Sequence, residues 1–194
     1  MFKGIIFNKG KVKNILRSKN SLTIEIVSNL NLKKKDLGTS ISCNGACLTI
    51  TAIKQKSVFF YLSKETLLRT NFSHLSKGNI INLEKSLKHG QLISGSYTQG
   101  HVDTTGIIKN IRIIDKSWVV RIAVKKQFKK YLIEKATITL NGVSLTISKV
   151  IKNNFEISII PHTLSLTNLD TMKIKELINI EFDIFIKYLS KLDI

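Results

Sequence analysis

At 194 residues the chain has room for one ordinary domain or two small ones, and a hydrophobic fraction of 43% is sufficient for a core. No apolar run approaches the roughly 18 residues that cross a bilayer, and residues 1–7 are too short for a signal-peptide core, so we expect a cytoplasmic protein without a membrane partner. The net charge of +18 suggests nucleic acid, but Lys-rich runs without interleaved aromatic residues are typical of solvated faces, so we expect no nucleic-acid partner.

Two stretches of the chain, residues 38–51 and 135–148, each predict a β-hairpin. Asn44-Gly45 and Asn141-Gly142 are at their centres, and Asn-Gly readily adopts the two positive φ angles of a type I′ turn. The flanking residues alternate with the period of a strand and include many β-branched side chains. Both hairpins continue as Leu-Thr-Ile, and the two turns are 97 positions apart.

The same spacing relates the two halves well beyond the hairpins. Thr66 and Asn82 recur as Thr163 and Asn179, again 97 positions later. At the start of each half the register slips to 96, because Gly4-Ile5-Ile6 corresponds to Gly100-His101-Val102. We therefore expect two tandem copies of one fold, residues 1–97 and residues 98–194, joined near residues 95–98.

Most of the signal within each copy indicates strands. Alternating segments lie at residues 21–27, 58–62 and 79–83, and at 118–122, 155–160 and 178–182. Five or six short strands per hundred residues predict a small closed barrel, which hides its sheet edges. The fold class is thus all-β with short helices, as two barrels in tandem.

Comparison of the two copies places one short helix in each. Pro161 suits the first helical position, and Ser63, at the position equivalent to Ile160, is a favourable N-cap. These signals predict helices over residues 64–69 and 161–166. The tail, residues 184–192, has helical spacing with one apolar face, which either packs on its own barrel or makes an oligomer contact.

Two residues distinguish the halves chemically. Cys47 in the first hairpin corresponds to Ser144 in the second, and a thiol is far more nucleophilic than a hydroxyl. His101 can transfer a proton near neutral pH. From the residues alone, a lone Cys is more often a small core residue, and an isolated His is more often structural. Cys43 and Cys47 are not directly opposite across the turn, so we expect reduced thiols rather than a disulfide, and no zinc site.

Seven motifs, in order along the chain, resemble the riboflavin synthase α chain, and the resemblance covers essentially the whole sequence. They are Met1-Phe2-Lys3-Gly4-Ile5-Ile6, Asn44-Gly45-Ala46-Cys47-Leu48-Thr49, Lys64-Glu65-Thr66-Leu67, Gly100-His101-Val102-Asp103, Asn141-Gly142-Val143-Ser144-Leu145-Thr146, Ile160-Pro161-His162-Thr163-Leu164 and Asn179-Ile180-Glu181-Phe182-Asp183.

The resemblance implies two six-stranded Greek-key barrels, each with one bound 6,7-dimethyl-8-ribityllumazine, in a homotrimer. It implies the last step of riboflavin biosynthesis, in which one lumazine gives a four-carbon unit to a second, forming riboflavin and 5-amino-6-ribitylaminouracil without a metal or a redox cofactor. The N-terminal barrel of one subunit would face the C-terminal barrel of another. Lumazine synthase is a candidate protein partner.

The resemblance also implies roles for individual residues. Cys47 and His101 would act in catalysis, assisted by hydrogen bonds from Ser40 and Thr49. The expected substrate contacts around the first barrel are Gly4, Ile5, Ile6, Cys47, Leu48, Thr49, Tyr61, Leu62, Ser63, Lys64, Glu65, Thr66, Gly100, His101 and Val102. Those of the second barrel are Lys135, Ser144, Leu145, Thr146, Ile160, Pro161, His162, Thr163, Leu164 and Ser165, with Asp183 holding ribityl hydroxyls or a neighbouring loop.

Two other functions stay open. A non-catalytic lumazine- or flavin-binding protein of the same fold would keep one competent barrel and lose the other. Both halves keep Leu-Thr after the hairpin and Thr-Leu at the helix start, which favours the enzyme. A nucleic-acid-binding barrel would have to use the basic surface, and salt dependence would reveal it.

Overall fold

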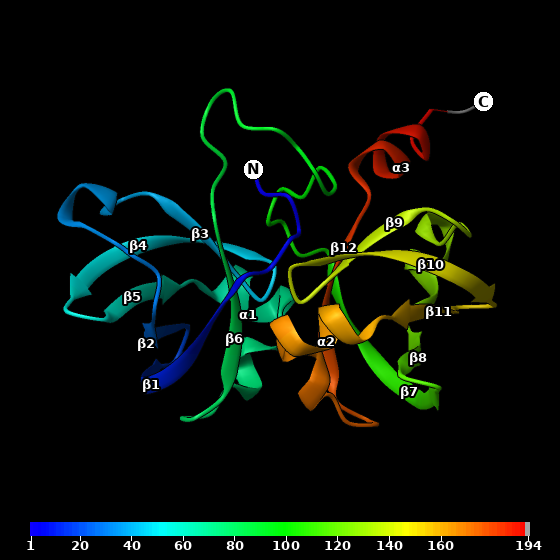
Figure 1. The fold of residues 1–194 in the computed structure, drawn as a ribbon, viewed down its shortest axis with the longest axis horizontal. Coiled ribbons are helices and arrows are strands. Elements are labelled where there is room, and N and C mark those ends of the chain that lie inside the picture. Colours follow the sequence, from blue (N-terminus) through cyan, green and yellow to red (C-terminus); the bar gives the residue numbers. More distant parts are fainter. Residues whose placement is uncertain (193–194) are drawn as a thin grey trace.

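The computed structural model describes residues 1–192, and they form two closed six-stranded antiparallel barrels that lie side by side (Figure 1). The first barrel consists of β1 (Asn8–Ser18), β2 (Ser21–Ser28), β3 (Ser40–Cys43), β4 (Ala46–Lys54), β5 (Ser57–Leu62) and β6 (Ile80–Lys85). The second consists of β7 (Thr104–Ile114), β8 (Ser117–Ala123), β9 (Thr137–Leu140), β10 (Val143–Ile151), β11 (Asn154–Ile159) and β12 (Leu177–Phe182).

Strand order is the same in both barrels. Around the first it runs β1-β2-β5-β4-β3-β6, and around the second β7-β8-β11-β10-β9-β12. In each barrel the chain therefore passes over a neighbouring hairpin before it closes the sheet, which is a Greek-key path. The predicted fold class is confirmed.

Short helices connect the strands. The predicted α1 (Lys64–Arg69) and α2 (Pro161–Leu166) are confirmed, and Ser63 caps α1 by accepting a hydrogen bond from the Thr66 amide at 3.4 Å. The tail forms α3 (Ile184–Leu189). The described residues also form four 3-10 segments: η1 (Lys34–Asp36), η2 (Asn71–His74), η3 (Lys126–Tyr131) and η4 (Asn168–Thr171). Over residues 1–192, no helix has the length and apolar character needed to cross a membrane.

Each barrel has its own core, made by alternate residues of its strands. Ile24 of β2 pairs with Phe60 of β5, and both side chains are fully buried. Strands β1 and β7 were not among the predicted segments. In β1 only Gly10 and Val12 are buried and most other positions are exposed, so its apolar alternation is too short to signal a strand.

The two hairpin turns touch each other where the barrels meet. Asn44 and Gly45 have φ angles of 43° and 84°, as the predicted type I′ turn requires, and Asn141 and Gly142 have 45° and 81°. A Cβ added to Gly45 would be 2.9 Å from the Gly142 amide nitrogen, and one added to Gly142 would be 2.9 Å from that of Gly45. Glycine at both positions therefore allows the turns to pack backbone to backbone.

Buried asparagines hold this contact in a repeated pattern. Asn82 donates from its side chain to the Asn141 carbonyl at 2.9 Å, and Asn179 donates to the Asn44 carbonyl at 2.9 Å. The Asn82 side-chain oxygen also accepts from the Asn168 amide at 2.7 Å. Each bond crosses between the barrels, so the 97-residue repeat is expressed as an approximate two-fold axis.

Candidate functional site

A cavity of about 470 Å³ opens beside the first hairpin, with Cys47 in its wall. The first barrel contributes β4 and α1, the segment leading into β7 contributes a second side, and Phe128 and Tyr131 of η3 come from the other barrel. Six of the predicted site residues line it together: Cys47, Glu65, Thr66, Gly100, His101 and Val102. The structure thus brings the thiol and the imidazole to one cavity.

Two extended segments, which we call strap 2–6 and strap 98–103, pass between the barrels. They pair with each other where the Phe2 amide donates to the Thr98 carbonyl at 2.7 Å. Strap 98–103 leads into the second barrel but packs on the first, since the Cys47 amide donates to the Gly100 carbonyl at 2.7 Å. Val102 packs against the core of the first barrel.

Strap 2–6 makes the reciprocal contact. It leads into the first barrel, yet the Ser144 amide of the second barrel donates to the Gly4 carbonyl at 2.8 Å, and Ile6 is buried in the second core. Gly4 and Ile6, expected around the first barrel, therefore pack on the second, and the substrate contact predicted for Gly4, Ile5 and Ile6 stays a prediction. The straps are exchanged, so each barrel is completed by the segment that precedes the other.

Close packing fixes each strap at a glycine. Gly100 has a φ of +80°, and an added Cβ would be 2.6 Å from the Cys47 Cβ. Gly4 has a φ of +71° and stands in the same relation to the Ser144 Cβ, also at 2.6 Å. Since both the dihedral and the space exclude a side chain, the backbone beside Cys47 and Ser144 is tightly defined.

A buried glutamate anchors each strap, and neither was expected from the sequence. Glu181 accepts from the Gln99 and Gly100 amides at 2.7 and 3.0 Å. Glu84 accepts from the Lys3 and Gly4 amides at 2.8 and 3.0 Å. Burial raises the pKa of both carboxyl groups above its usual value, opposed by these backbone hydrogen bonds. The repeated Asn-X-Glu at residues 82–84 and 179–181 was the available signal.

Other predicted residues lie on the hairpins. Thr49 is two residues from Cys47 on β4 and so shares its outward face, and Ser40 is paired with Thr49 across the sheet. Ser144 and Thr146 are related in the same way on β10. Ser40 and Thr49 do not line the cavity of Cys47.

Several predicted contacts have side chains that face the barrel interiors. Leu48, Leu62 and Leu164 are at most 8% exposed, because strand and helix periodicity directs them into the cores. Asp183 accepts from the Phe185 amide at 2.8 Å as the N-cap of α3, and it lies outside the cavity of Cys47.

The remaining predicted contacts lie away from that cavity. They are Tyr61, Ser63 and Lys64 of the first barrel, and Lys135, Leu145, Ile160, Pro161, His162, Thr163 and Ser165 of the second. Tyr61 and Ile160 are more than half exposed, and Lys135 adopts a φ of 69° just before β9. Their part in binding stays a prediction.

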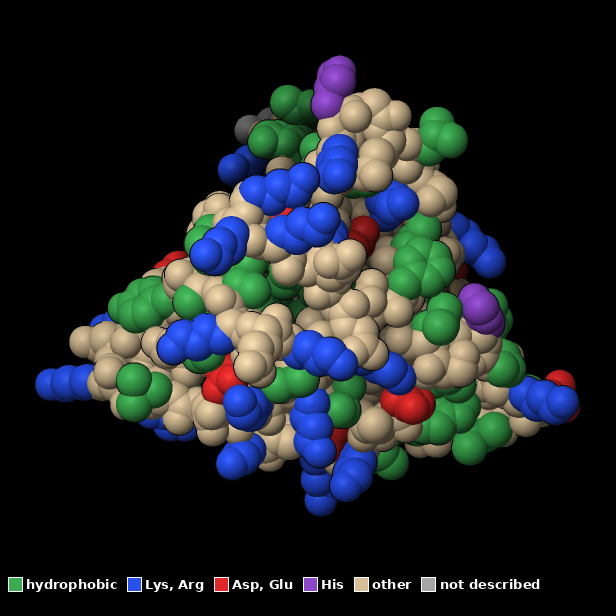
Figure 2. All heavy atoms as spheres, turned by 60° about the vertical axis from the view of Figure 1, so that its left-hand side comes forward, with side chains coloured by type: hydrophobic (Ala, Val, Ile, Leu, Met, Phe, Trp, Pro, Cys, Tyr) green, Lys and Arg blue, Asp and Glu red, His purple; other side chains and the backbone are tan. Residues whose placement is uncertain are grey.

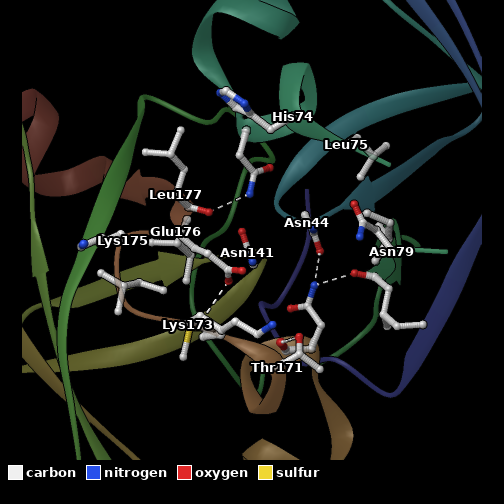
Figure 3. Close-up of a pocket in the computed structure, with 17 residues that line it drawn as sticks. Asn44, His74, Leu75, Asn79, Asn141, Thr171, Lys173, Lys175, Glu176 and Leu177 are labelled. Carbon is white, nitrogen blue, oxygen red and sulfur yellow. Dashed lines mark hydrogen bonds between the residues drawn. The ribbon is translucent and has the colours of Figure 1, made fainter. Parts of the chain in front are cut away.

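A larger cavity of about 670 Å³, not expected from the sequence, lies between the barrels (Figure 3). Its walls repeat at the 97-residue spacing, with Asn44 and Asn141 among them. Figure 3 shows the His74 ring and the Lys175 amino group directed away from its centre. None of the residues assigned to catalysis lines it.

Basic side chains are spread over the face drawn in Figure 2, interspersed with neutral and apolar ones. Cys43 is buried in the first core, which raises the pKa of its thiol, and both cysteines are free. Within residues 1–192 no three or more His, Cys, Asp or Glu side chains gather in a way that could hold a metal ion.

Known proteins resemble the chain along nearly its whole length. The sequence model of the lumazine binding domain matches it twice, over residues 3–86 and 99–183. The chain is 39% identical over 187 residues to riboflavin synthase of Buchnera aphidicola subsp. Schizaphis graminum, covering 95% of this chain and 90% of that protein. It is 37% identical over 193 residues to riboflavin synthase of Photobacterium leiognathi, covering 99% of this chain and 88% of that one.

Solved structures agree in fold. LumP complexed with 6,7-dimethyl-8-(1'-D-ribityl) lumazine matches with a TM-score of 0.81 at 27% identity, covering 93% of this chain and 98% of that chain. LumP complexed with riboflavin matches with a TM-score of 0.83 at 28% identity, covering 94% and 99%. Two matches to one domain, and relatives above 30% identity over almost the full length, show that the chain belongs to the riboflavin synthase family, with tandem lumazine binding domains.

Proposed function

We propose that the protein is a riboflavin synthase, which converts two molecules of 6,7-dimethyl-8-ribityllumazine into riboflavin and 5-amino-6-ribitylaminouracil. The observation that carries the proposal is the cavity in which Cys47 and His101 lie together beside a fixed strap. Riboflavin synthases are among the relatives, and LumP, which binds lumazine and riboflavin, has the same fold.

The residues of the first site have different roles, which follow from their side-chain chemistry. The Cys47 thiol assists as a nucleophile, and the His101 imidazole transfers protons to and from the ring substituents. Ser40 and Thr49 supply hydrogen bonds from the outward face of the hairpin. The site holds the two rings in register, so the reaction no longer needs a bimolecular encounter. This positioning can lower the activation free energy by roughly 7–11 kcal/mol.

The second barrel holds the other substrate molecule. Strap 2–6, Ser144 and Thr146 surround its site, where a hydroxyl replaces the thiol of Cys47. Each barrel thus binds one lumazine, the first completed by strap 98–103 and the second by strap 2–6, and only the first has a thiol at this hairpin position.

Assembly completes the proposal. Phe185, Tyr188 and Leu189 of α3 are each more than half exposed, which supports a contact between copies of the chain. We propose a homotrimer in which the first barrel of one subunit faces the second barrel of its neighbour. A cytoplasmic location and association with lumazine synthase complete the expected setting.

Purified protein incubated with lumazine tests the activity, with riboflavin formation followed by absorbance. Cys47→Ser and His101→Gln should lower kcat with modest change in KM, because their interactions are made mostly in the transition state. Thr146→Val should raise KM, because it removes a ligand hydrogen bond from both ground and transition states. Wild-type kcat in both Cys47→Ser and His101→Gln would place the chemistry elsewhere.

A second candidate function has a specific observation in its favour. LumP matches along nearly the whole chain, and lumazine or riboflavin occupies it. A non-catalytic binding protein would bind lumazine with a change in its fluorescence and yield no riboflavin. The same incubation therefore separates the two functions.

A further inference from the structure

An ion pair connects strap 98–103 to the C-terminal helix. The Lys187 Nζ of α3 donates to both carboxylate oxygens of Asp103 at 3.1 Å. The two side chains are only 18% and 21% exposed, so the pair is largely shielded from water. Asp103 is two residues from His101 and lines the same cavity as Cys47.

Asp103 and Glu181 bring two carboxylates to one short segment. Asp103 accepts from the Phe182 amide at 2.8 Å, directly after Glu181, whose own carboxylate holds the strap at Gly100. Burial and the nearby Asp103 raise the pKa of Glu181, whereas a hydrogen bond from Gln99 and the charge of Lys187 lower it. Lys187 therefore offsets two acidic groups, Asp103 on the strap and Glu181 on β12. Arg69 lines the same cavity, and its hydrogen bond to Glu65 and the charge of Asp103 raise its pKa, so it is a second cation near Asp103.

Within residues 1–192, strap 2–6 has no ion pair of this kind. The position equivalent to Asp103 is Phe7, which is 69% exposed. The first barrel ends at β6 and continues into residues 86–98, which contain no helix, whereas β12 continues into α3 (Figure 1). The ion pair is thus confined to the strap that packs on Cys47.

We propose that Lys187 is a positioning residue, which through Asp103 holds strap 98–103, and with it Gly100 and His101, against Cys47. The proposal rests on the proposed function for its kinetic consequence. Removal of the ammonium group leaves Asp103 and Glu181 to repel each other where both are largely shielded from water, and the strap moves away from Cys47. A displacement of about 1 Å can cost roughly 100-fold in rate.

Three variants separate positioning from simple stability. Lys187→Met removes the cation and keeps the length of the side chain, and Lys187→Arg keeps the charge. Lys191→Met, just beyond α3, makes the same change of charge at a residue that has no ion pair within residues 1–192. We expect Lys187→Met to lower kcat by about 10-fold or more with KM within about twofold, and the other two variants to stay within about threefold of wild type.

A second measurement does not depend on turnover. Gly100 packs on Cys47, and Cys43 is buried. The rate at which a thiol reagent such as 5,5′-dithiobis(2-nitrobenzoic acid) labels the protein therefore measures how closely strap 98–103 packs against Cys47. Lys187→Met should label several-fold faster, with unchanged rates in Lys187→Arg and Lys191→Met. Wild-type labelling in Lys187→Met overturns the proposal whether or not riboflavin forms. A wild-type protein that yields no riboflavin overturns the proposed function and leaves the labelling result to decide the role of Lys187.

Discussion

Gly100→Ala tests the contact between strap 98–103 and the first hairpin. The new Cβ would be 2.6 Å from the Cys47 Cβ and 2.9 Å from Cε2 of Phe2, and the residue would keep a φ of +80°. The left-handed backbone costs about 1–2 kcal/mol for a residue with a side chain. Overpacking against Cys47 adds about 1–3 kcal/mol, so we expect a total loss of roughly 2–5 kcal/mol.

Gly38→Ala is the matched control. Gly38 has a φ of +78°, and no atom lies within 4 Å of the added Cβ, so only the backbone term of about 1–2 kcal/mol applies. Urea unfolding followed by circular dichroism measures both variants against wild type. The free energy of unfolding should fall further in Gly100→Ala by about 1–3 kcal/mol, which corresponds to a Tm difference of roughly 2–12 °C for a chain of this size.

Activity gives the second half of this test. If the strap positions His101, Gly100→Ala should lose most of its kcat in the conditions where it remains folded, and Gly38→Ala should retain it. Equal destabilisation of the two variants, together with equal kcat, would show that the strap does not press on Cys47 as described.

Three further outcomes are expected. Asn82→Ala leaves the Asn141 carbonyl and the Asn168 amide without partners, so it should lower the free energy of unfolding by about 2–4 kcal/mol. Urea titration measures this loss, and a value below about 1 kcal/mol would contradict the role of the buried asparagines. Hydrogen bonds from Ser57 and Lys13 lower the pKa of Glu25 from 4.5 to about 2, so the stability it contributes is present above pH 4.5 and is lost as the pH falls from 4.5 to 2. Tm measured across that window should fall more steeply for wild type than for Glu25→Gln; parallel curves would refute the assignment. Binding to DNA should be weak and largely abolished at physiological salt. Tight binding at that salt in a filter assay would contradict the interpretation that the basic residues are solvated and form no nucleic-acid site.

Local chemistry explains which parts of the fold could be predicted. The Asn-Gly turns, the Ser63 cap and Pro161 act within a few residues, and the structure has the expected turns and helices at those places. The 97-residue spacing alone predicted two copies of one fold, without any information about packing. The sequence pattern did not predict strand β1, because so few of its residues reach the core.

The site was harder to predict because its parts meet through the arrangement of the barrels. The sequence indicated Cys47 and His101 as candidate catalytic residues, and both line the same cavity. Gly4 and Ser144 are 140 positions apart in sequence, and nothing near either residue indicates their contact. Glu84 and Glu181 were visible as repeated residues, but a carboxylate that holds a backbone segment leaves no local pattern.

The exchanged straps also make the two barrels one thermodynamic unit. If the barrels separate, strap 98–103 leaves Cys47 and strap 2–6 leaves Ser144, so both sites open in the same event. A ligand that requires a closed site therefore strengthens the docking of the barrels, by about 2.7 kcal/mol when its concentration is 100 times its Kd. By the same linkage, a ligand bound in one of the two proposed sites favours the closed state of the other, without any change in the shape of either barrel.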